Sequence, residues 1–261
     1  ITARVIPGSN MKSEVFHMTF GLFFQNLVNG ISLGSLYALI AIGYTMVYGI
    51  VRLINFAHGD IIMLSAYFVF FGVGLFSLPW WAAVIISVGL TVLTGIVIEK
   101  TAYKPLREAP RISVLISAIG VSFFLENMGL VVFGGRAKAF YTPPIFKGVI
   151  SIAGISIPSL ALIIPAISAL LLMGMIYIVN HTKTGMAMRA CSKDMDTAKL
   201  MGIDVDRIIS FTFGIGSALA SVGGIMWALK YPQIHPLIGI MPGLKCFIAA
   251  VVGGIGNIPG A

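Results

Sequence analysis

Charged side chains are the residue class that this sequence has least of. Only 10% of its 261 residues are Asp, Glu, Lys or Arg, while 58% are hydrophobic and the mean hydropathy is +0.99. Soluble domains carry about 25% charged residues. So few charges cannot cover a soluble domain of this length, so part of the surface must face lipid. The composition excludes a soluble domain and predicts a polytopic membrane protein.

Cysteine and the common catalytic motifs are also scarce or missing. The two cysteines, Cys191 and Cys246, are too few for a disulfide framework, and we expect free thiols. The sequence contains no GxxxxGK[ST] phosphate loop, no HExxH and no CxxC. We therefore expect neither catalysis nor a metal site. The net charge of +8 does not indicate nucleic-acid binding, because the basic residues fall between apolar runs rather than in one patch.

Long apolar runs dominate what is present. A helix needs about 20 mostly apolar residues to cross a bilayer. The candidate spans are Leu27–Ile50, Ile61–Leu78, Trp80–Ile98, Ile112–Phe133, Pro158–Val179, Ile208–Leu229 and Ile238–Val252. The Phe-rich stretch Phe16–Leu27 is expected to be an interfacial helix or the lead-in to the first span. The predicted fold is an all-α membrane bundle with about seven transmembrane segments, some of them broken or interrupted by glycine.

The charges of the short loops predict how the bundle is oriented. Glu99–Arg111 contains four Lys or Arg residues and His181–Arg207 contains five. Two predicted spans separate these loops, so both lie on one side, which the positive-inside rule assigns to the cytoplasm. Gly134–Ile157 has three basic residues and should face the opposite side.

The two ends of the chain differ in composition from its middle. Residues 1–10 begin without Met and lack periodicity, so we expect a non-native leader before a single membrane domain over residues 11–261. The last stretch, VVGGIGNIPGA, is too rich in Gly and Pro for a plain helix. It is expected to be buried in the bundle or to lie at its end, because broken backbone is not tolerated in lipid. The domain is expected to be incomplete at its C-terminus.

One polar stretch, RLINFAHGD at Arg52–Asp60, separates two apolar runs. Its polar residues and Gly59 could form a break in a membrane helix that presents backbone groups to a solute. The preferred interpretation is simpler, a short cytoplasmic turn between two spans.

Glu126 lies inside the predicted span Ile112–Phe133. An intramembrane carboxylate indicates a functional role by default. Glu126 lies toward the outer end of this span, so it could equally reach the membrane–water interface or pair with Arg136. The candidate residues of a translocation pathway are Asn55, His58, Gly59, Asp60 and Glu126.

The longest polar interval is His181–Arg207, and its interior predicts one short amphipathic helix. Residues at three- and four-residue steps share one face of that helix. They are Cys191, Met195, Ala198 and Met201. Asp194 and Asp196 occupy the first turns, Lys199 lies near the end, and Gly202 stands where a helix C-terminus favours glycine. A solvated surface helix and a helix that docks on a partner protein both fit this pattern.

Four stretches are distinctive together. They are NGISLGSLYALIAIGYTMVYGIVRLINFAHGD (Asn29–Asp60), LISAIGVSFFLEN (Leu115–Asn127), GMAMRACSKDMDTAKLMGIDVDRIISFTF (Gly185–Phe213) and AAVVGGIGNIPGA (Ala249–Ala261). From about Asn26 to the last residue, the chain resembles the permease subunits of bacterial ABC importers for branched-chain amino acids. It is most similar to the first of the two permeases that pair in such a transporter.

The resemblance implies that residues 181–207 are a cytoplasmic coupling loop. Such permeases carry the signature E-A-A-x-x-x-G on a helix that fits a groove in the ATPase subunit. Asp196-Thr197-Ala198-Lys199-Leu200-Met201-Gly202 lies in register with it, with Asp in place of Glu and Thr in place of the first Ala. The resemblance therefore favours the docking helix. The expected coupling residues are Asp194, Met195, Asp196, Ala198, Lys199, Met201 and Gly202.

The resemblance also implies the partners and the location. They are a second permease, two ATPase subunits that bind ATP and Mg²⁺, an extracytoplasmic solute-binding protein, and the lipid of a bacterial inner membrane. This chain itself would bind no cofactor. Chains of this family continue by at least one further apolar segment.

Two alternatives to an importer of leucine, isoleucine and valine are open. The first is a secondary transporter or channel driven by an ion gradient, with His58, Asp60 and Glu126 handling protons or cations. The second keeps the ABC importer but changes its substrate to urea, short amides or other amino acids.

Overall fold

The structure of the chain is a computed structural model, and it describes residues 9–52, 54–107, 109–152, 155–254 and 256. Among these residues, five helices are long and apolar enough to cross a membrane, and two shorter helices are also apolar. The predicted all-α membrane bundle with interrupted helices is confirmed. Residues 1–8 of the expected leader and residues 257–261 of the Gly-rich end lie outside the described residues.

Nine helices and four short strands follow one another in the described residues. The helices are α1 (Ser9–Val51), α2 (His58–Gly74), α3 (Trp80–Ile98), α4 (Arg111–Phe133), α5 (Ser159–His181), α6 (Lys183–Lys193), α7 (Met195–Leu200), α8 (Val205–Lys230) and α9 (Ile240–Gly253). Short turns of other helix types are η1 (Glu99–Tyr103) and η2 (Lys104–Leu106), which continue α3, and η3 (Pro144–Phe146). The strands are β1 (Lys138–Ala139), β2 (Val149–Ile152), β3 (Ile155–Pro158) and β4 (Gln233–Ile234).

The strands, which the sequence analysis did not predict, form two antiparallel pairs. β1 pairs with β4, with Lys138 opposite Ile234. β2 pairs with β3, with Ile150 opposite Ile157.

Two of the seven predicted spans are too short to cross a membrane alone. α2 has 17 residues and α9 has 14, against the requirement of about 20. The predicted Ile61–Leu78 extended too far, because α2 ends at Gly74 and the chain turns before Pro79. By contrast, α1 has 43 residues and includes Phe16–Leu27. That stretch is therefore the lead-in to the first span rather than a separate interfacial helix.

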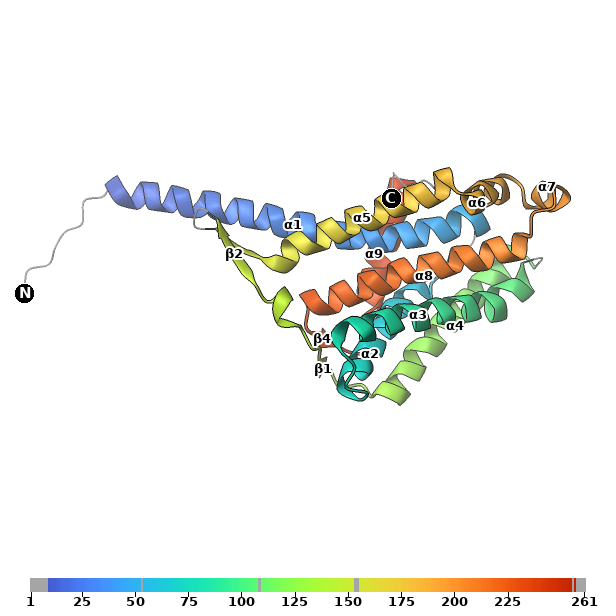
Figure 1. Cartoon of the computed structure of the whole chain (residues 1–261), viewed down its shortest axis with the longest axis horizontal. Coiled ribbons are helices and arrows are strands. Elements are labelled where there is room, and N and C mark those ends of the chain that lie inside the picture. Colours follow the sequence, from blue (N-terminus) through green and yellow to red (C-terminus); the bar gives the residue numbers. More distant parts are fainter. Residues whose placement is uncertain (1–8, 53, 108, 153–154, 255, 257–261) are drawn as a thin grey trace, which may run out of the picture.

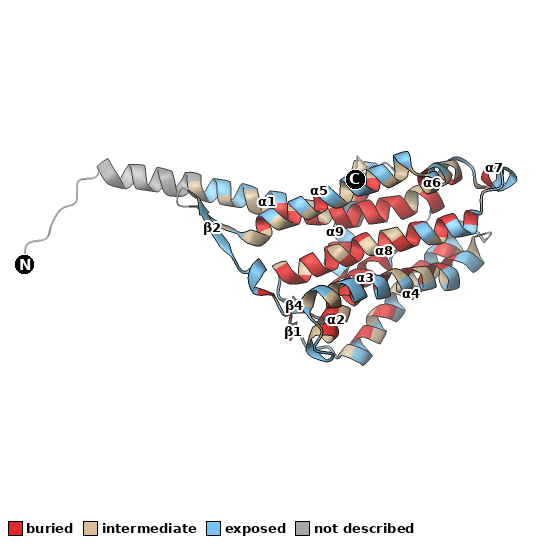
Figure 2. Cartoon of the chain, in the orientation of Figure 1, coloured by how far each residue is buried: buried red, intermediate tan, exposed pale blue. Residues whose placement is uncertain are grey.

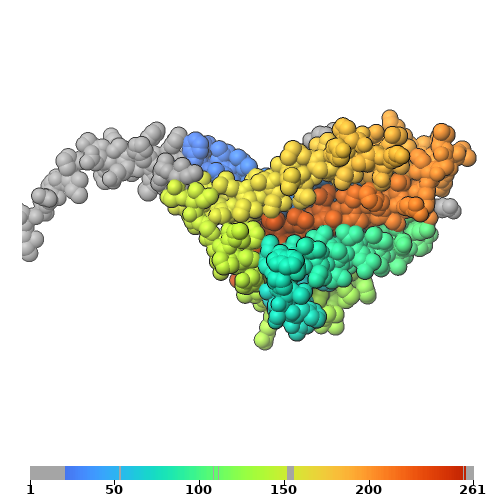
Figure 3. All heavy atoms as spheres, viewed as in Figure 1, coloured from blue at the N-terminus to red at the C-terminus, as the bar shows by residue number. Residues whose placement is uncertain are grey.

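α8 lies at the centre of the bundle. It packs against α1, α2 and α3, and most of its length is buried (Figure 2). α5 lies along α1 and covers one side of α8, while α3 covers another side (Figures 1 and 3). The outward faces of α3, α4 and α5 carry exposed apolar side chains, including Leu93, Phe124 and Leu170. Such faces suit contact with lipid or with another membrane subunit.

The two strongly basic loops lie at the same end of the molecule. α6 and α7 are at the right of Figure 1, beside η1 and η2, while the strand pairs lie at the other end. Lys104 of η2 forms an ion pair of 2.6 Å with Asp206 of α8, which joins the two loops directly. The predicted placement of both loops on one side is confirmed, and the positive-inside rule predicts that this side faces the cytoplasm.

Candidate functional site

The connection between α1 and α2 turns back into the bundle. Arg52, with φ of 54°, follows the end of α1 and donates a hydrogen bond of 3.0 Å to the carbonyl of Ser192. The next helix begins at His58, whose Nε2 lies 3.2 Å from the carbonyl oxygen of Ile40. Ile40 lies about 16 Å along α1 from Val51, at a rise of about 1.5 Å per residue. The chain therefore turns back from the end of α1 toward the middle of the bundle before α2 starts.

This placement corrects the preferred interpretation of Arg52–Asp60 as a short cytoplasmic turn. The stretch does turn, but Asn55, His58 and Asp60 are all buried. Asp60 accepts a hydrogen bond of 2.6 Å from Ser122, which lies midway along α4. Since α4 is long enough to span the membrane, Asp60 lies near mid-membrane depth.

A pocket of about 180 Å³ lies between α2, α4 and α9. Asp60 and Glu126 both line it, together with Ser122 and Tyr44. The Tyr44 hydroxyl is buried and has no hydrogen-bond partner among the described residues. Drug-sized ligands occupy sites of about 300–1,000 Å³, so this pocket suits a smaller polar group.

The starts of α2 and α9 meet at this pocket, backbone against backbone. A Cβ atom placed on Gly239, which precedes α9, would lie 1.9 Å from the carbonyl oxygen of Gly59. Any side chain at Gly239 would therefore force the two helix starts apart. Helices that begin inside a membrane bundle direct their N-terminal ends toward bound solutes in transporters.

The structure brings only some of the five predicted pathway residues together at this pocket. Gly59, Asp60 and Glu126 line the pocket, whereas Asn55 and His58 lie outside its lining. The Asn55 Oδ1 atom accepts a hydrogen bond of 3.0 Å from the Tyr103 hydroxyl. The proposed pairing of Glu126 with Arg136 is wrong, because no ion pair joins them in the described part of the chain.

Tyr44, Ser122 and Gly239 also line the pocket, and the sequence analysis missed them. They come from α1, α4 and the start of α9, so no local pattern links them. A useful signal was available in the Gly- and Pro-interrupted segment 236–243, because interrupted apolar segments are the best pointer to a solute site.

The polar interval His181–Arg207 contains two helices, α6 and α7, rather than the single predicted one. Asp194 separates them in an extended conformation, and its Oδ1 accepts hydrogen bonds from the backbone of Asp196 at 2.9 Å and Thr197 at 3.3 Å. The hydrogen bond from the Thr197 hydroxyl lowers the pKa of Asp194 below its ordinary value. Asp194 therefore ends α6 and caps α7, and Cys191 does not share a helix with Met195.

The predicted apolar face of this interval is divided between inside and outside. Cys191 and Ala198 are buried in the bundle, so Ala198 cannot touch a partner directly. Leu200 and Met201 are 87% and 78% exposed, at the end of α7. We call these two side chains the α7 tip. The sequence analysis included Met201 but missed Leu200.

Charged side chains surround the α7 tip. The side chains of Asp196 and Lys199 are 92% and 60% exposed, and the Lys199 Nζ atom lies 3.7 Å from the Asp196 Oδ1 atom. Gly202 has φ of 81°, as expected for the residue that ends the helix. The two cysteines, Cys191 and Cys246, are both free and buried, as predicted.

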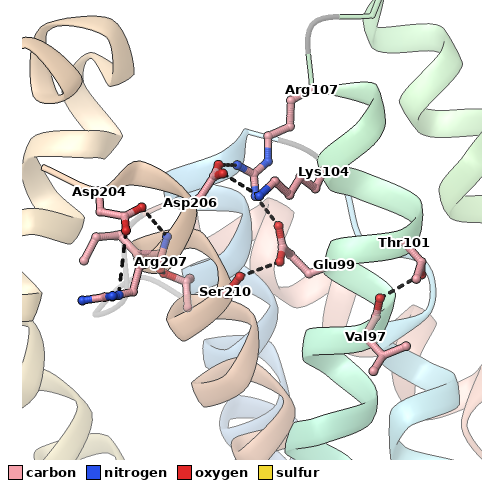
Figure 4. Close-up of polar contacts among 11 residues, drawn as sticks. Val97, Glu99, Thr101, Lys104, Arg107, Asp204, Asp206, Arg207 and Ser210 are labelled. Atoms are coloured by element: carbon pink, nitrogen blue, oxygen red, sulfur yellow. Dashed lines mark hydrogen bonds and ion pairs between the residues drawn. The ribbon is translucent and has the colours of Figure 1, made fainter.

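A groove of about 1020 Å³ lies beside α7, lined also by η2 and the first turn of α8. An ion-pair network joins residues that line this groove (Figure 4). Arg107 pairs with both Glu99 and Asp206, and Ser210 of α8 donates a hydrogen bond of 2.7 Å to Glu99. Glu99 is completely buried, so its charge depends on these partners. The network fixes the α3–α4 connection to α8.

Helices that stop midway through a membrane bundle, beside a buried polar pocket, are typical of transport proteins. The comparison with protein families identifies the class of transporter. Residues 26–261 match the family described as the permease component of the branched-chain amino acid transport system. The chain belongs to this family, and it is a multi-pass membrane protein.

Named relatives support this assignment over most of the chain. The high-affinity branched-chain amino acid transport system permease protein BraD of Pseudomonas aeruginosa is 42% identical over 259 residues, covering 95% of this chain and 83% of that protein. The corresponding protein LivH of Escherichia coli K12 is 41% identical over 255 residues, covering 93% and 82%. A probable LivH of Methanocaldococcus jannaschii is 28% identical over 246 residues, covering 90% and 75%. No solved structure matches the chain.

Proposed function

We propose that this chain is one of two permeases in an ATP-driven importer of leucine, isoleucine and valine in a bacterial inner membrane. A solute-binding protein delivers the amino acid, and two ATPase subunits bind ATP and Mg²⁺. The observation that carries the proposal is the 41–42% identity to permeases named for branched-chain amino acid transport. The chain has no motif for hydrolysing ATP itself, so it relies on those subunits.

The α7 tip is the proposed contact with an ATPase subunit. Leu200 and Met201 are exposed to water at an end of the protein that is otherwise rich in charges. Burying one such side chain contributes about 1.5–3 kcal/mol, so a partner with an apolar groove would gain from covering both. Of the expected coupling residues, Met201 makes this contact and Asp196 and Lys199 flank it. Asp194, Ala198 and Gly202 shape and seat the helix.

The Glu99–Arg107–Asp206 network and the groove beside α7 connect the proposed ATPase contact mechanically to the membrane helices. Asp206 lies in the first turn of α8, the central helix of the bundle, and the network joins it to Glu99 of η1, which continues α3. A rigid-body displacement of α7 by the ATPase would therefore move α8 and α3 together. These helices pack on α2, whose first turn lines the intramembrane pocket.

Uptake of labelled leucine tests the proposed energy source. Cells would express the chain with a second permease, ATPase subunits and a solute-binding protein, and an uncoupler would collapse the proton gradient while glycolysis maintains ATP. Uptake should survive the uncoupler and stop when ATP is depleted. Uptake that collapses with the gradient while ATP stays high would contradict the proposal.

A second candidate, a secondary transporter driven by an ion gradient, is favoured by one observation. Asp60 and Glu126 share an intramembrane pocket, as the proton- or cation-binding groups of such a transporter would. In that case, Asp60→Asn with Glu126→Gln should abolish gradient-driven uptake, and substitutions at the α7 tip should have no effect. If the chain is instead an ATP-driven permease, substitutions at the α7 tip should abolish uptake.

A further inference from the structure

Lys245 is the only charged residue in the sequence of α9, and it lies in the helix's second turn. Its side chain is exposed, and its ammonium group lies 5.6 Å from the centre of the Tyr37 ring. No ion pair involves Lys245 in the described part of the chain. The sequence analysis passed over this lysine because the predicted span Ile238–Val252 absorbed it.

Lys245 lies at membrane depth. Tyr37 is near the middle of the apolar segment Gly21–Val51, and its ring contacts Trp227 of α8 with ring centres 5.8 Å apart. An ammonium group facing lipid at this depth is costly, and such groups face the bundle interior or a water-filled path. The exposed face of α9 that carries Lys245 is therefore turned toward a solute path or toward another subunit rather than toward lipid.

The start of α9 adds to the positive potential around Lys245. Gly239 provides no side-chain cap, and the first turn of α9 contains no acidic residue. Side chains on a helix point back toward its N-terminus, so the ammonium group lies toward the positive end of the helix dipole. Two positive groups on the same side attract an anion.

The polar pocket lies along the same face of α1 that Lys245 contacts. Tyr37 and Tyr44 share one face of α1, because they are two turns apart, which is about 10 Å along the helix. Tyr44 packs on Phe247 of α9, with ring centres 5.5 Å apart, and lines the pocket with Asp60 and Glu126. Along this face of α1, the Lys245 ammonium group is thus followed by the pocket that contains two carboxyl groups and the unpartnered Tyr44 hydroxyl.

We propose that Lys245 binds the carboxylate of a free α-amino acid and so selects zwitterionic substrates as they enter the path. The Asp60–Glu126 pocket then receives the ammonium group of the same molecule. Tyr37, which Lys245 contacts, and Tyr44, which lines the pocket, are about 10 Å apart along α1, so the two ends of the amino acid are recognised in succession. This inference rests on the proposed amino-acid import, and it adds a specificity residue to it.

The test uses the complete transporter in proteoliposomes with labelled leucine. Lys245→Met should lower the rate of leucine uptake at least about tenfold, because a charge-assisted hydrogen bond is lost. ATP hydrolysis stimulated by the leucine-loaded binding protein should persist, and the second permease should still co-purify. Lys245→Arg should restore most of the uptake. The matched control is Lys230→Met, which removes a lysine that donates to Ser32 at 3.0 Å, and it should change uptake less than about twofold.

Two outcomes would overturn the inference. Unchanged leucine uptake by Lys245→Met would show that the lysine does not contact the substrate. Loss of the second permease from the purified complex would show that Lys245 instead pairs with that subunit. Failure of the unsubstituted transporter to show ATP-dependent leucine uptake would contradict the proposed function itself, so the two failures are distinguishable.

Discussion

The intramembrane pocket and the α7 tip differ in which groups they leave without a partner. The pocket contains the buried Asp60 carboxyl and the unpartnered Tyr44 hydroxyl within an apolar bundle. The α7 tip exposes Leu200 and Met201 to water. Unpartnered polar groups in an apolar interior and large apolar groups in water both cost free energy. The comparison therefore teaches that a polar solute should occupy the first region and a protein should cover the second.

The largest expected effect is at the contact between the starts of α2 and α9. Gly239→Ala should destabilise the bundle by about 3 kcal/mol, since its Cβ would overlap the Gly59 carbonyl group. Separation of the two helix starts would also distort the pocket, so leucine uptake should fall. Unfolding by denaturing detergent measures the change. Gly89→Ala is the matched control, because nothing lies within 4 Å of a Cβ there. Equal stability of the two variants would contradict the close packing.

The next effect concerns the network that joins the two regions. Arg107→Met should lower the free energy of unfolding by about 3 kcal/mol, because it leaves the completely buried Glu99 without its countercharge. Adding Glu99→Gln should recover most of that loss. Lys104→Met, which removes an exposed partner of Asp206, should cost at most about 1 kcal/mol. Additive effects of the two buried substitutions would show that Glu99 and Arg107 are not coupled.

A substitution at the α7 tip should reduce leucine uptake without changing the stability of the protein. Leu200→Asp should reduce leucine uptake at least about tenfold by placing a charge in an apolar contact. Because Leu200 is 87% exposed, membrane insertion and the detergent unfolding midpoint should not change. Leu200→Met keeps the apolar contact and should keep uptake. An active Leu200→Asp variant would remove the α7 tip from the coupling mechanism.

The smallest effect is expected from the charge of Asp194. Asp194→Asn should retain most uptake, since the amide oxygen can still cap α7, whereas Asp194→Ala should lose several-fold. The folded-state pKa of Asp194 is lowered, so its contribution is present above the unfolded-state pKa and lost as pH falls through the lowered value. Uptake between pH 6 and pH 8 should therefore be insensitive to this group. Equal losses in the Asn and Ala variants would indicate that the charge itself contacts a partner.

The sequence predicts the spans well because length and apolar composition are local properties. It predicts Gly202 as the end of a helix for the same reason. The split between α6 and α7 was missed, although Asp194 is a favourable N-cap residue, because the apolar spacing suggested one continuous face. The sequence analysis placed Asp194 and Asp196 near a helix start, as α7 has them, but wrongly included Cys191 of α6 in the same helix.

Contacts between distant residues could not be predicted. The pairs Glu99–Asp206 through Arg107, Asp60–Ser122 and Gly59–Gly239 join segments from about 60 to 180 positions apart, and no periodicity encodes such pairings. The depth of Asp60 also depends on how far the chain rises after α1, which the residues of Arg52–Asp60 do not specify. Lys245 was visible in the sequence, but its apolar neighbours concealed it.

The account depends most directly on an ATPase subunit covering the α7 tip. Cys191 and Cys246 are buried, so a cysteine introduced by Leu200→Cys is the accessible thiol for labelling among the described residues. In inside-out vesicles with the assembled transporter, this thiol should cross-link to an ATPase subunit and be shielded from a water-soluble maleimide. It should become reactive when the ATPase subunits are stripped off. Equal maleimide labelling before and after stripping, without cross-linking, would contradict the account.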